Sequence, residues 1–482
     1  MAMSILRTLV ALCVSGILAS PLAQTPQASQ SANLDPYPGK PRIVFRKDGT
    51  LKITVFSDLH FGENPWDWWG PEHDLNSTKL MKRVLKDEKP DYAVINGDLI
   101  TGENTFKENS TLLIDQIVAP LNAAKVPFSS THGNHDNQPN ITHAEEIARE
   151  LKVAPLSYTR TAPAGVGGEG GPGNYWVPRG VLKPQLDRSP SLVIWFFDSR
   201  GGFSKPDVGI PDFVDTSVAP WIASETQAMN EAWGPGITRS SLAFVHIPPH
   251  YIEDVQYTIT PEKNPGLNAD ELGLGSVQKT DDIPFWGAVK QNLQNLVAVI
   301  SGHDHGNEWC AREPTKDIVF CFDKHSGYGG YTGTDWGYGV RNLVFHLSSN
   351  TSELPKVESW IRLEEGETRA HVWIDDTLGS LRRLALRLEL TIADYQLTQK
   401  NWLLAGNLQD RVIYIFMSER TYHPPCVNGE YTPDTVVDSS YSDDFSYLKQ
   451  RCRRDGTSSI SLGLGGTPYA RADMRVYFGQ YS

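Results

Sequence analysis

The sequence predicts an α/β (α+β) fold in which two packed, mixed β-sheets are flanked by helices in four layers, followed by a β-rich C-terminal extension. Between residues 41 and 305, short apolar runs alternate with amphipathic helical patterns, which is typical of parallel strands with helices outside them. Beyond residue 305, the runs 318–322, 340–347 and 357–363 read as strands with little helix between them. These later runs suggest a second sheet packed on the first.

Strand and helix patterns alternate three times in the first part of this region. The runs 53–56, 92–95 and 126–131 are short, apolar or β-branched, and read as strands. Helices follow them, beginning at Asn76 or Ser77, at Ser110, and at Thr142, which forms a capping box with Glu145. Later strands are expected at 192–197, 242–245 and 296–300, and Pro284 opens the helix before the last of these.

Residues of the types that commonly bind metals, Asp, Asn and His, follow these strands directly. Because the carboxyl ends of parallel strands meet at one edge of a sheet, the loops are expected to converge. The seven candidate ligands on five loops are Asp58, His60, Asp98, Asn134, His246, His303 and His305.

This ligand set is too large for one tetrahedral ion. Two ions that share one carboxylate would use all seven side chains, and the mixture of oxygen and nitrogen suits zinc, iron or manganese better than calcium. Taken singly, His60 or His246 would more often be a structural histidine, and Asp98 would more often cap a turn. Their occurrence together favours a binuclear centre.

The ordered motifs carry a resemblance to a known family. Asp58-x-His60, Gly97-Asp98, Gly133-Asn134-His135-Asp136, His246 and Gly302-His303-x-His305 resemble the calcineurin-like metallophosphoesterase superfamily. The flanking residues 74–78, 246–248 and 302–310 are similar to its purple acid phosphatase-like branch of fungi and plants, which includes phosphatases named inactive. The resemblance covers residues 41–375.

The resemblance implies a role for each motif residue. Asp58, His60 and His305 would hold one ion, Asn134, His246 and His303 the other, and Asp98 would bridge them. A metal-activated hydroxide would then attack a phosphate ester, most readily a monoester. His135 would protonate the leaving group or stabilise the transition state, and Asp136 would orient His135.

Two alternatives to this reading remain. One is a phosphodiesterase of the same fold, and the other is a non-catalytic, metal-stabilised secreted binding protein. The intact His135 makes the non-catalytic alternative less attractive.

Two positions depart from the purple enzymes. They bind ferric iron through a tyrosine three residues after the bridging aspartate, where this chain has Thr101, and they lack a histidine ligand at the place of His60. We therefore expect no tyrosinate charge-transfer colour.

Three residues near the motifs have other expected roles. Asp304 is expected to fix its loop, and His132 to be structural, while His250 could belong either to the substrate pocket or to the scaffold. The tryptophans of 66–69 are read as a packed loop in preference to a substrate-binding wall.

Composition bounds the function further. The chain has 482 residues and a net charge of −13 without a strong basic run, which argues against nucleic-acid binding. Residues 1–23 resemble a secretory signal peptide and 24–40 a flexible leader, and no later stretch is apolar enough to span a membrane. We therefore expect a protein that is secreted or lies in the secretory lumen. The domains expected after the leader are a phosphoesterase domain over 41–375 and an extension of unknown role over 376–482.

Cysteine usage agrees with an oxidising compartment. Four cysteines remain after the signal segment, and of three formal pairings we favour Cys310–Cys321 and Cys426–Cys452, because each pair is close in sequence. Four Asn-x-Ser/Thr sequons, at Asn76, Asn109, Asn140 and Asn350, are candidate glycan sites. The sequence leaves the oligomeric state open.

Overall fold

The structure is a computed structural model that describes residues 34–378 and five strands beyond residue 400. Within the first range it leaves out 180–188, 238, 269, 271, 273–274, 314–316, 349, 351–352 and 376–377. The chain divides into two compact units, residues 1–384 and 385–482.

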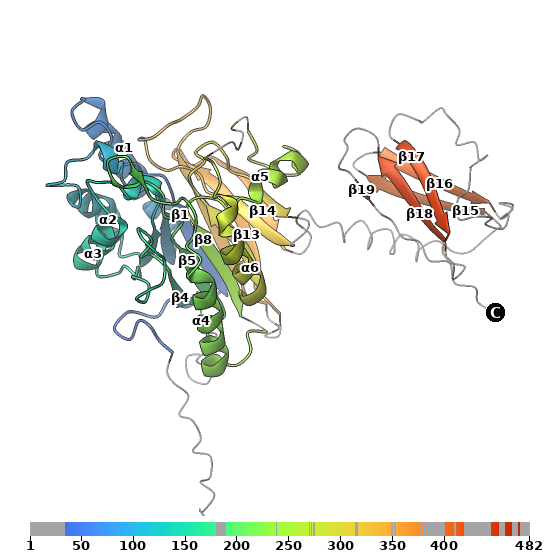
Figure 1. Cartoon of the computed structure of the whole chain (residues 1–482), viewed down its shortest axis with the longest axis horizontal. Coiled ribbons are helices and arrows are strands. Elements are labelled where there is room, and N and C mark those ends of the chain that lie inside the picture. Colours follow the sequence, from blue (N-terminus) through green and yellow to red (C-terminus); the bar gives the residue numbers. More distant parts are fainter. Residues whose placement is uncertain are drawn as a thin grey trace, which may run out of the picture. The chain divides into compact units, whose positions relative to one another are not determined.

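The first unit contains two six-stranded mixed sheets (Figure 1). Sheet 1 has the order β14-β13-β12-β1-β2-β3, with β1–β3 parallel and β12–β14 antiparallel. Its strands are β1 (Thr50–Phe56), β2 (Tyr92–Asn96), β3 (Phe128–Thr131), β12 (Gly339–His346), β13 (Lys356–Leu363) and β14 (Thr368–Ile374).

Sheet 2 has the order β10-β11-β9-β8-β5-β4, with antiparallel strands at its two edges. Its strands are β4 (Tyr175–Arg179), β5 (Leu192–Phe197), β8 (Ser240–Val245), β9 (Leu296–Ser301), β10 (Cys310–Glu313) and β11 (Ile318–Phe322). A small ribbon of β6 (Phe203–Lys205) and β7 (Val208–Gly209) lies outside both sheets.

Alternating side chains divide the apolar residues among three cores. Val55 and Val94 of sheet 1 and Phe196 of sheet 2 belong to the core between the sheets. Ile95 faces the opposite way, into the core under α1 (Trp69–Glu88) and α2 (Leu112–Ala124). A third core joins sheet 2 to α4 (Val218–Trp233) and α6 (Ile283–Asn292). The result is four layers, helix, sheet, sheet, helix (Figure 1).

The remaining elements are short or peripheral. Helix α3 (His143–Val153) packs against α2 and begins with the predicted Thr142–Glu145 capping box. The others are α5 (Ile252–Val255) and the 3₁₀ turns η1 (Gly102–Asn104), η2 (Asn134–Asp136), η3 (Gln256–Thr258) and η4 (Thr280–Asp282). The second unit contains a hairpin of β15 (Asn401–Leu408) and β16 (Arg411–Ser418), and a three-stranded sheet of β17 (Phe445–Cys452), β18 (Ser458–Leu464) and β19 (Arg471–Ala472).

The predicted fold class is confirmed, but the assignment of strands to sheets is partly wrong. The runs 318–322, 340–347 and 357–363 are predicted to form the second sheet together. β11 does lie in sheet 2, whereas β12 and β13 belong to sheet 1, where β12 pairs antiparallel with β1. Pairing between strands almost 300 residues apart satisfies the open edge of β1, and local sequence pattern does not encode it. Helix α1 also begins earlier than predicted, at Trp69.

The predicted disulfide Cys310–Cys321 is present, between directly paired residues of β10 and β11. Cys426, the N-terminal signal segment and the alternating run 384–392 lie outside the described residues. Among the described helices, none combines the length and apolar character needed to cross a membrane.

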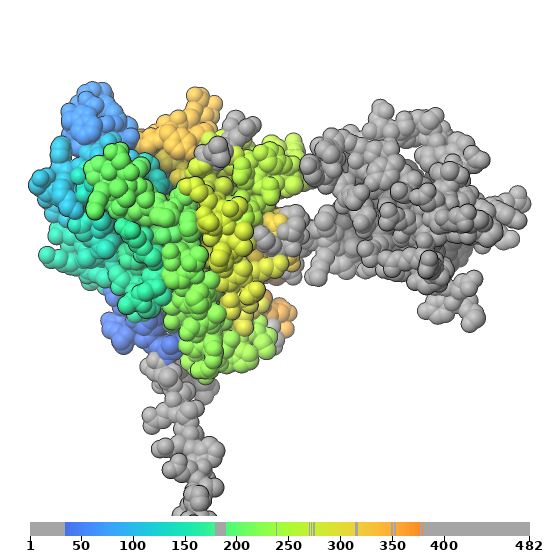
Figure 2. Space-filling view, in the orientation of Figure 1, coloured from blue at the N-terminus to red at the C-terminus, as the bar shows by residue number. Residues whose placement is uncertain are grey.

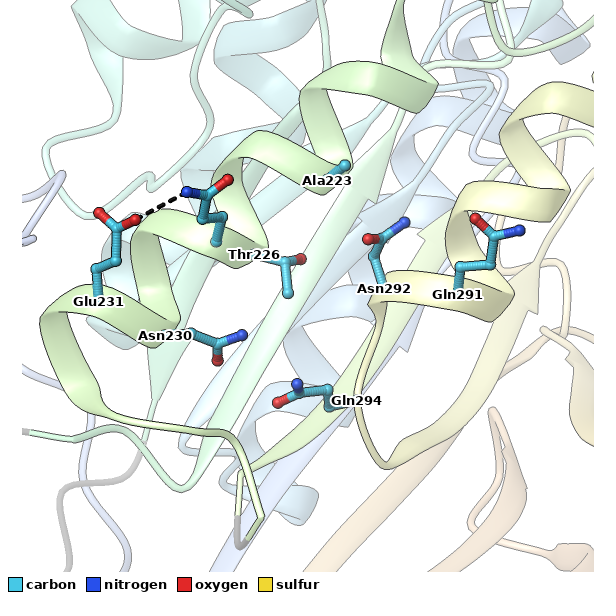
Figure 3. A pocket seen from close by; sticks show the side chains of 8 residues that line it. Ala223, Thr226, Asn230, Glu231, Gln291, Asn292 and Gln294 are labelled. Carbon is cyan, nitrogen blue, oxygen red and sulfur yellow. Dashed lines mark hydrogen bonds between the residues drawn. The ribbon is translucent and has the colours of Figure 1, made fainter.

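A groove with a volume of ≈ 530 Å³ is lined by residues of α4, the end of α6 and Gln294 (Figure 3). Its lining is mostly polar and comprises Ala223, Thr226, Gln227, Asn230, Glu231, Gln291, Asn292 and Gln294. Glu231 is its only ionisable side chain and bonds to Gln227. The groove therefore contains none of the predicted ligands and no set of donors for a metal.

Gly97, directly after β2, lies close against His246 of the other sheet. Its φ is +84°, and a Cβ at this position would lie 2.3 Å from Nδ1 of His246, which follows β8. Only a residue without a side chain fits both the backbone conformation and the space.

We expect the Gly97→Ala variant to lose roughly 2–5 kcal/mol of unfolding free energy, from left-handed backbone strain and steric overlap together. Gly287→Ala is the matched control, because Gly287 lies within α6 and a Cβ there meets nothing within 4 Å. That control should gain about 1 kcal/mol. Urea denaturation of both variants measures the difference, and equal stability of the two would contradict the account.

Candidate metal centre

Five loops bring the predicted ligands to one end of the two sheets. Asp58 and His60 follow β1, Asp98 follows β2, and Asn134 begins η2 just after β3. From sheet 2, His246 follows β8, and His303 and His305 follow β9. The end of β2 also joins the sheets directly, because the Asn96 amide donates to the Ile300 carbonyl of β9.

Four of the ligand residues adopt a left-handed backbone conformation. The φ angles are 52° for Asp58, 48° for His60, 47° for Asp98 and 70° for His303. Such angles are uncommon for residues with a side chain and cluster at functional sites, where surrounding contacts hold them in place. Here the backbone amides of neighbouring loops do so, for example where His303 N donates to Asp58 Oδ1 at 3.0 Å.

The side chains form two groups that could each hold an ion. Within each group one ligand atom per residue lies within 4.8 Å of the others, and the groups are Asp58, His60 and His305, and Asp98, His246 and His303. The groups adjoin, because Asp98 Oδ2 lies 2.9 Å from His246 Nε2 and 3.7 Å from His60 Nε2. Asp98 therefore stands between them, as a bridging carboxylate would.

Each of the four histidines is anchored through one ring nitrogen. The other nitrogen of His60 and of His305 faces the first ligand group, where the two Nε2 atoms lie 3.3 Å apart, and that of His246 faces Asp98. Nδ1 of His246 donates to the Asn96 carbonyl at 2.7 Å, Nδ1 of His305 to the Tyr331 carbonyl at 2.6 Å, and Nε2 of His303 to the Gly275 carbonyl at 2.8 Å. Nδ1 of His60 lies 3.0 Å from the Thr101 hydroxyl. Anchoring of this kind fixes the tautomer of metal-binding imidazoles.

Asn134 supplies a further sign that the residues fit a metal. Its Oδ1 is buried and has no hydrogen-bond partner among the described residues. A buried carbonyl oxygen without a partner is costly, and an ion in the group of His246 and His303 would satisfy it.

Charge balance points the same way. Burial alone would raise the pKa of Asp58 and Asp98, but the adjacent imidazoles outweigh burial and hold both pKa values below the usual range. Burial also opposes protonation of His246, yet Asp98 and Asp58 raise its pKa to about 10. The buried carboxylates therefore favour positive charge beside them, which cations at the two ligand groups would supply.

His135 lies beside the ligands and is partly exposed. Its backbone amide donates to Asp98 Oδ1 at 2.9 Å, and its ring meets the His60 ring edge to face, with centroids 5.0 Å apart. Nδ1 lies 2.6 Å from Oε1 of Glu103. Burial would lower the pKa of His135, but the charges of Asp98 and Glu103 raise it to about 9.

Asp136 is predicted to orient the His135 ring, but its carboxylate bonds to backbone amides instead. Its carboxylate accepts the backbone amides of Ile100, at 3.0 Å, and Gly133, at 2.8 Å. It therefore ties the loop after β2 to the loop after β3. Burial raises its pKa to about 7.

His132, His250 and Asp304 lie outside the two ligand groups. His132 is fully buried, with its ring 5.1 Å from that of His143. His250 pairs with Asp282. Asp304 accepts from the Asn307 side chain at 2.7 Å, which agrees with the predicted role in fixing the loop.

The sequence did not predict the contacts that Thr101, Glu103 and Tyr331 make with the site. Thr101 takes the place of the tyrosine ligand and supports His60 instead, while Glu103 bonds to His135 and Tyr331 contacts His305. Glu103, five residues beyond Asp98, is the one that a search for carboxylates near the motif could have found. The prediction of a packed tryptophan loop is wrong for Trp66 and Trp68, which are 61% and 80% exposed.

Comparison with known proteins agrees with this geometry. The chain matches the calcineurin-like phosphoesterase family over residues 51–307, more than half of its length. This range includes all seven predicted ligands and His135.

Individual relatives share about a quarter or less of their residues with this chain. "Probable inactive purple acid phosphatase 28" of Arabidopsis thaliana is 24% identical over 67% of this chain and 83% of its own length. "Phosphatase DCR2" of Saccharomyces cerevisiae is 27% identical over 67% of this chain and 56% of its own length. A crystal structure of a dimetal phosphatase from Danio rerio aligns with 68% of this chain and 99% of its own, at 12% identity and a TM-score of 0.41. The chain belongs to the calcineurin-like phosphoesterase family, and its named relatives place it in the purple acid phosphatase-like branch.

Proposed function

We propose that this protein is a secreted, binuclear-metal phosphoesterase that hydrolyses phosphoric esters, with phosphomonoesters as the foremost substrates. The observation that carries the proposal is the pair of candidate ligand groups that adjoin at Asp98, with the partly exposed His135 beside them. Zinc, iron or manganese suits the mixture of donors. Export is supported by the N-terminal apolar segment and by the Cys310–Cys321 disulfide.

When bound, the metal pair would orient the phosphate, neutralise charge on its oxygens and activate a water molecule. The residues around it have distinct tasks. Asp58 and Asp98 would provide the negative charge that retains two cations, and the anchored imidazoles would provide neutral ligand nitrogens. These groups also lie in a largely buried setting, which strengthens their interactions with charge.

His135 is placed to move the proton that the leaving group needs. Because Nδ1 is engaged by Glu103, Nε2 is the ring atom available for donation to the leaving alkoxide oxygen. The carboxylate of Glu103 favours the protonated imidazole of His135. The hydrogen bond from the His135 backbone amide to Asp98 holds the residue near the ligands. Glu103 is therefore a positioning residue for His135.

A non-catalytic role is the second candidate, because relatives such as "Probable inactive purple acid phosphatase 28" are named as inactive. Metal content together with hydrolysis of aryl monoesters and diesters separates the candidates. Bound metal without turnover would support a binding protein, and faster turnover of diesters would make the protein a phosphodiesterase.

The His135→Asn variant should keep its metal and lose roughly 10²- to 10⁴-fold in kcat for an alkyl phosphate, whose poor leaving group needs the proton. His371→Asn, an exposed position on β14, is the control and should behave as wild type. Steady-state kinetics and metal analysis of both variants are the measurements. Unchanged turnover of His135→Asn would exclude the proposed proton donor.

The Glu103→Gln variant should lose roughly 10- to 100-fold in kcat, since the neutral amide no longer favours protonated His135. Its metal content should be unchanged, because Glu103 lies outside both ligand groups. Glu108→Gln, an exposed carboxylate close in sequence, serves as the matched control. If Glu103→Gln and Glu108→Gln had the same kcat, Glu103 would have no part in the reaction.

Removal of metal by a chelator should lower the thermal midpoint of unfolding by roughly 5 °C or more, because ions bound only by the folded state stabilise it.

Asp98→Asn should reduce bound metal from about two ions per chain to one or fewer, since both ions lose the shared ligand. The control is Asp207→Asn, an exposed residue whose φ of 65° asparagine also tolerates. Two tightly held ions in Asp98→Asn would contradict the bridging role.

A further inference from the structure

A glycine-rich segment, residues 326–333, runs over one of the two ligand groups. Its backbone is tied to the loop after β1, because Ser326 N donates to the Ser57 carbonyl and Gly327 N to that of Asp58. At Gly330 the backbone reaches the ligand rings themselves. A Cβ there would lie 2.5 Å from Cε1 of His305 and 2.8 Å from Cδ2 of His60.

This segment places Tyr331 directly against His305. The phenol and imidazole rings are stacked, with centroids 4.1 Å apart and an angle of 12° between their planes. The Tyr331 hydroxyl accepts the His305 backbone amide at 2.8 Å, and its carbonyl accepts Nδ1 at 2.6 Å. The Tyr331 ring therefore lies directly on one member of a ligand group, His305.

Tyr331 nevertheless remains 50% exposed, unlike the ligands it contacts. Trp336 meets it edge to face, with ring centroids 5.9 Å apart. Trp336 also lies beside the ligand loop, because a Cβ at Gly306 would be 2.7 Å from its Cζ2 atom. Two aromatic side chains thus present accessible surface next to His305.

Acidic side chains outnumber basic ones around this surface, because Arg369, which donates to the Trp336 carbonyl, is itself paired with Glu308. Asp270 Oδ2 accepts the Gly306 amide at 2.9 Å and lies 3.4 Å from the Tyr331 hydroxyl. Glu63 bonds to the amide of Gly330. Figure 2 shows the segments near residues 65 (blue) and 330 (light orange) as projections at the same end of the first unit. A leaving group with additional negative charge would be repelled here.

We propose that Tyr331 and Trp336 form a specificity wall, which selects phosphate esters whose leaving group is a planar aromatic ring without negative charge. The inference rests on the proposed function, because it needs a phosphate held at the ligand groups. With the phosphate beside His305, the ester substituent extends along the exposed ring of Tyr331, where an aromatic group stacks and an aliphatic one gains less.

The experiment measures binding, so that chemistry does not enter. Isothermal titration of the metal-loaded protein with phenylphosphonate and with methylphosphonate gives the ratio of the two dissociation constants. Wild type should prefer phenylphosphonate, and Tyr331→Leu should reduce that preference roughly 3- to 10-fold while methylphosphonate binds as before. Trp336→Leu should reduce it in the same direction.

Two further variants separate ring contact from general disturbance. Tyr331→Phe keeps the ring and should retain the preference. Trp373→Leu removes an exposed tryptophan on β14 near His346, which pairs with Thr50 at the start of β1, away from the ligands, and it should change nothing. An unchanged preference in Tyr331→Leu would overturn the proposal. Loss of metal from Tyr331→Leu with equal weakening of both phosphonates would also overturn it, because the ring would then serve only His305.

The inference and the proposed function fail in different ways. If wild type prefers phenylphosphonate and Tyr331→Leu does not, yet no ester is hydrolysed, the specificity wall stands and the catalytic proposal falls. If phenyl phosphate is hydrolysed but substitution of Tyr331 leaves the preference intact, only the specificity wall falls.

Discussion

The burial of two carboxylates, Asp58 and Asp98, is the constraint on which this site depends. Both side chains are 1% exposed and lie between imidazoles, so their negative charge must be balanced within the protein. Cations held at the two ligand groups would supply the balancing positive charge. The surroundings of the site are arranged to keep these charges in place.

The arrangement extends from the ligands into both sheets. Asn96, at the end of β2, receives a hydrogen bond from His246, donates to the end of β9 and bonds to the Asp323 carboxylate at 2.6 Å. Gly97 and Gly133 let the ligand loops approach His246 more closely than any side chain would allow. The ligand geometry is thus set by how the two sheets pack, and the hydrogen bonds to each imidazole complete it.

Much of this centre was predictable because its signals are local. The strands before Asp58, Asp98 and His303 are recognisable as apolar runs that are followed by ligand residues. The carboxyl ends of parallel strands meet at one edge of a sheet, which brings these residues together. The long-range pairing of β12 with β1 was not predictable, because several strands of similar pattern could have occupied that edge. The contacts of Thr101, Glu103 and Tyr331 were missed for a related reason. Each acts through a contact made by a loop, and loop conformation leaves no periodic pattern in sequence.

The most direct test of the account is a crystal structure of the metal-loaded protein with anomalous scattering data. The account predicts two ions roughly 3.5–4 Å apart, both bound to the carboxylate of Asp98. One ion should contact Asp58, His60 and His305, and the other Asn134, His246 and His303. A single ion, or two ions without a shared Asp98, would contradict the central claim.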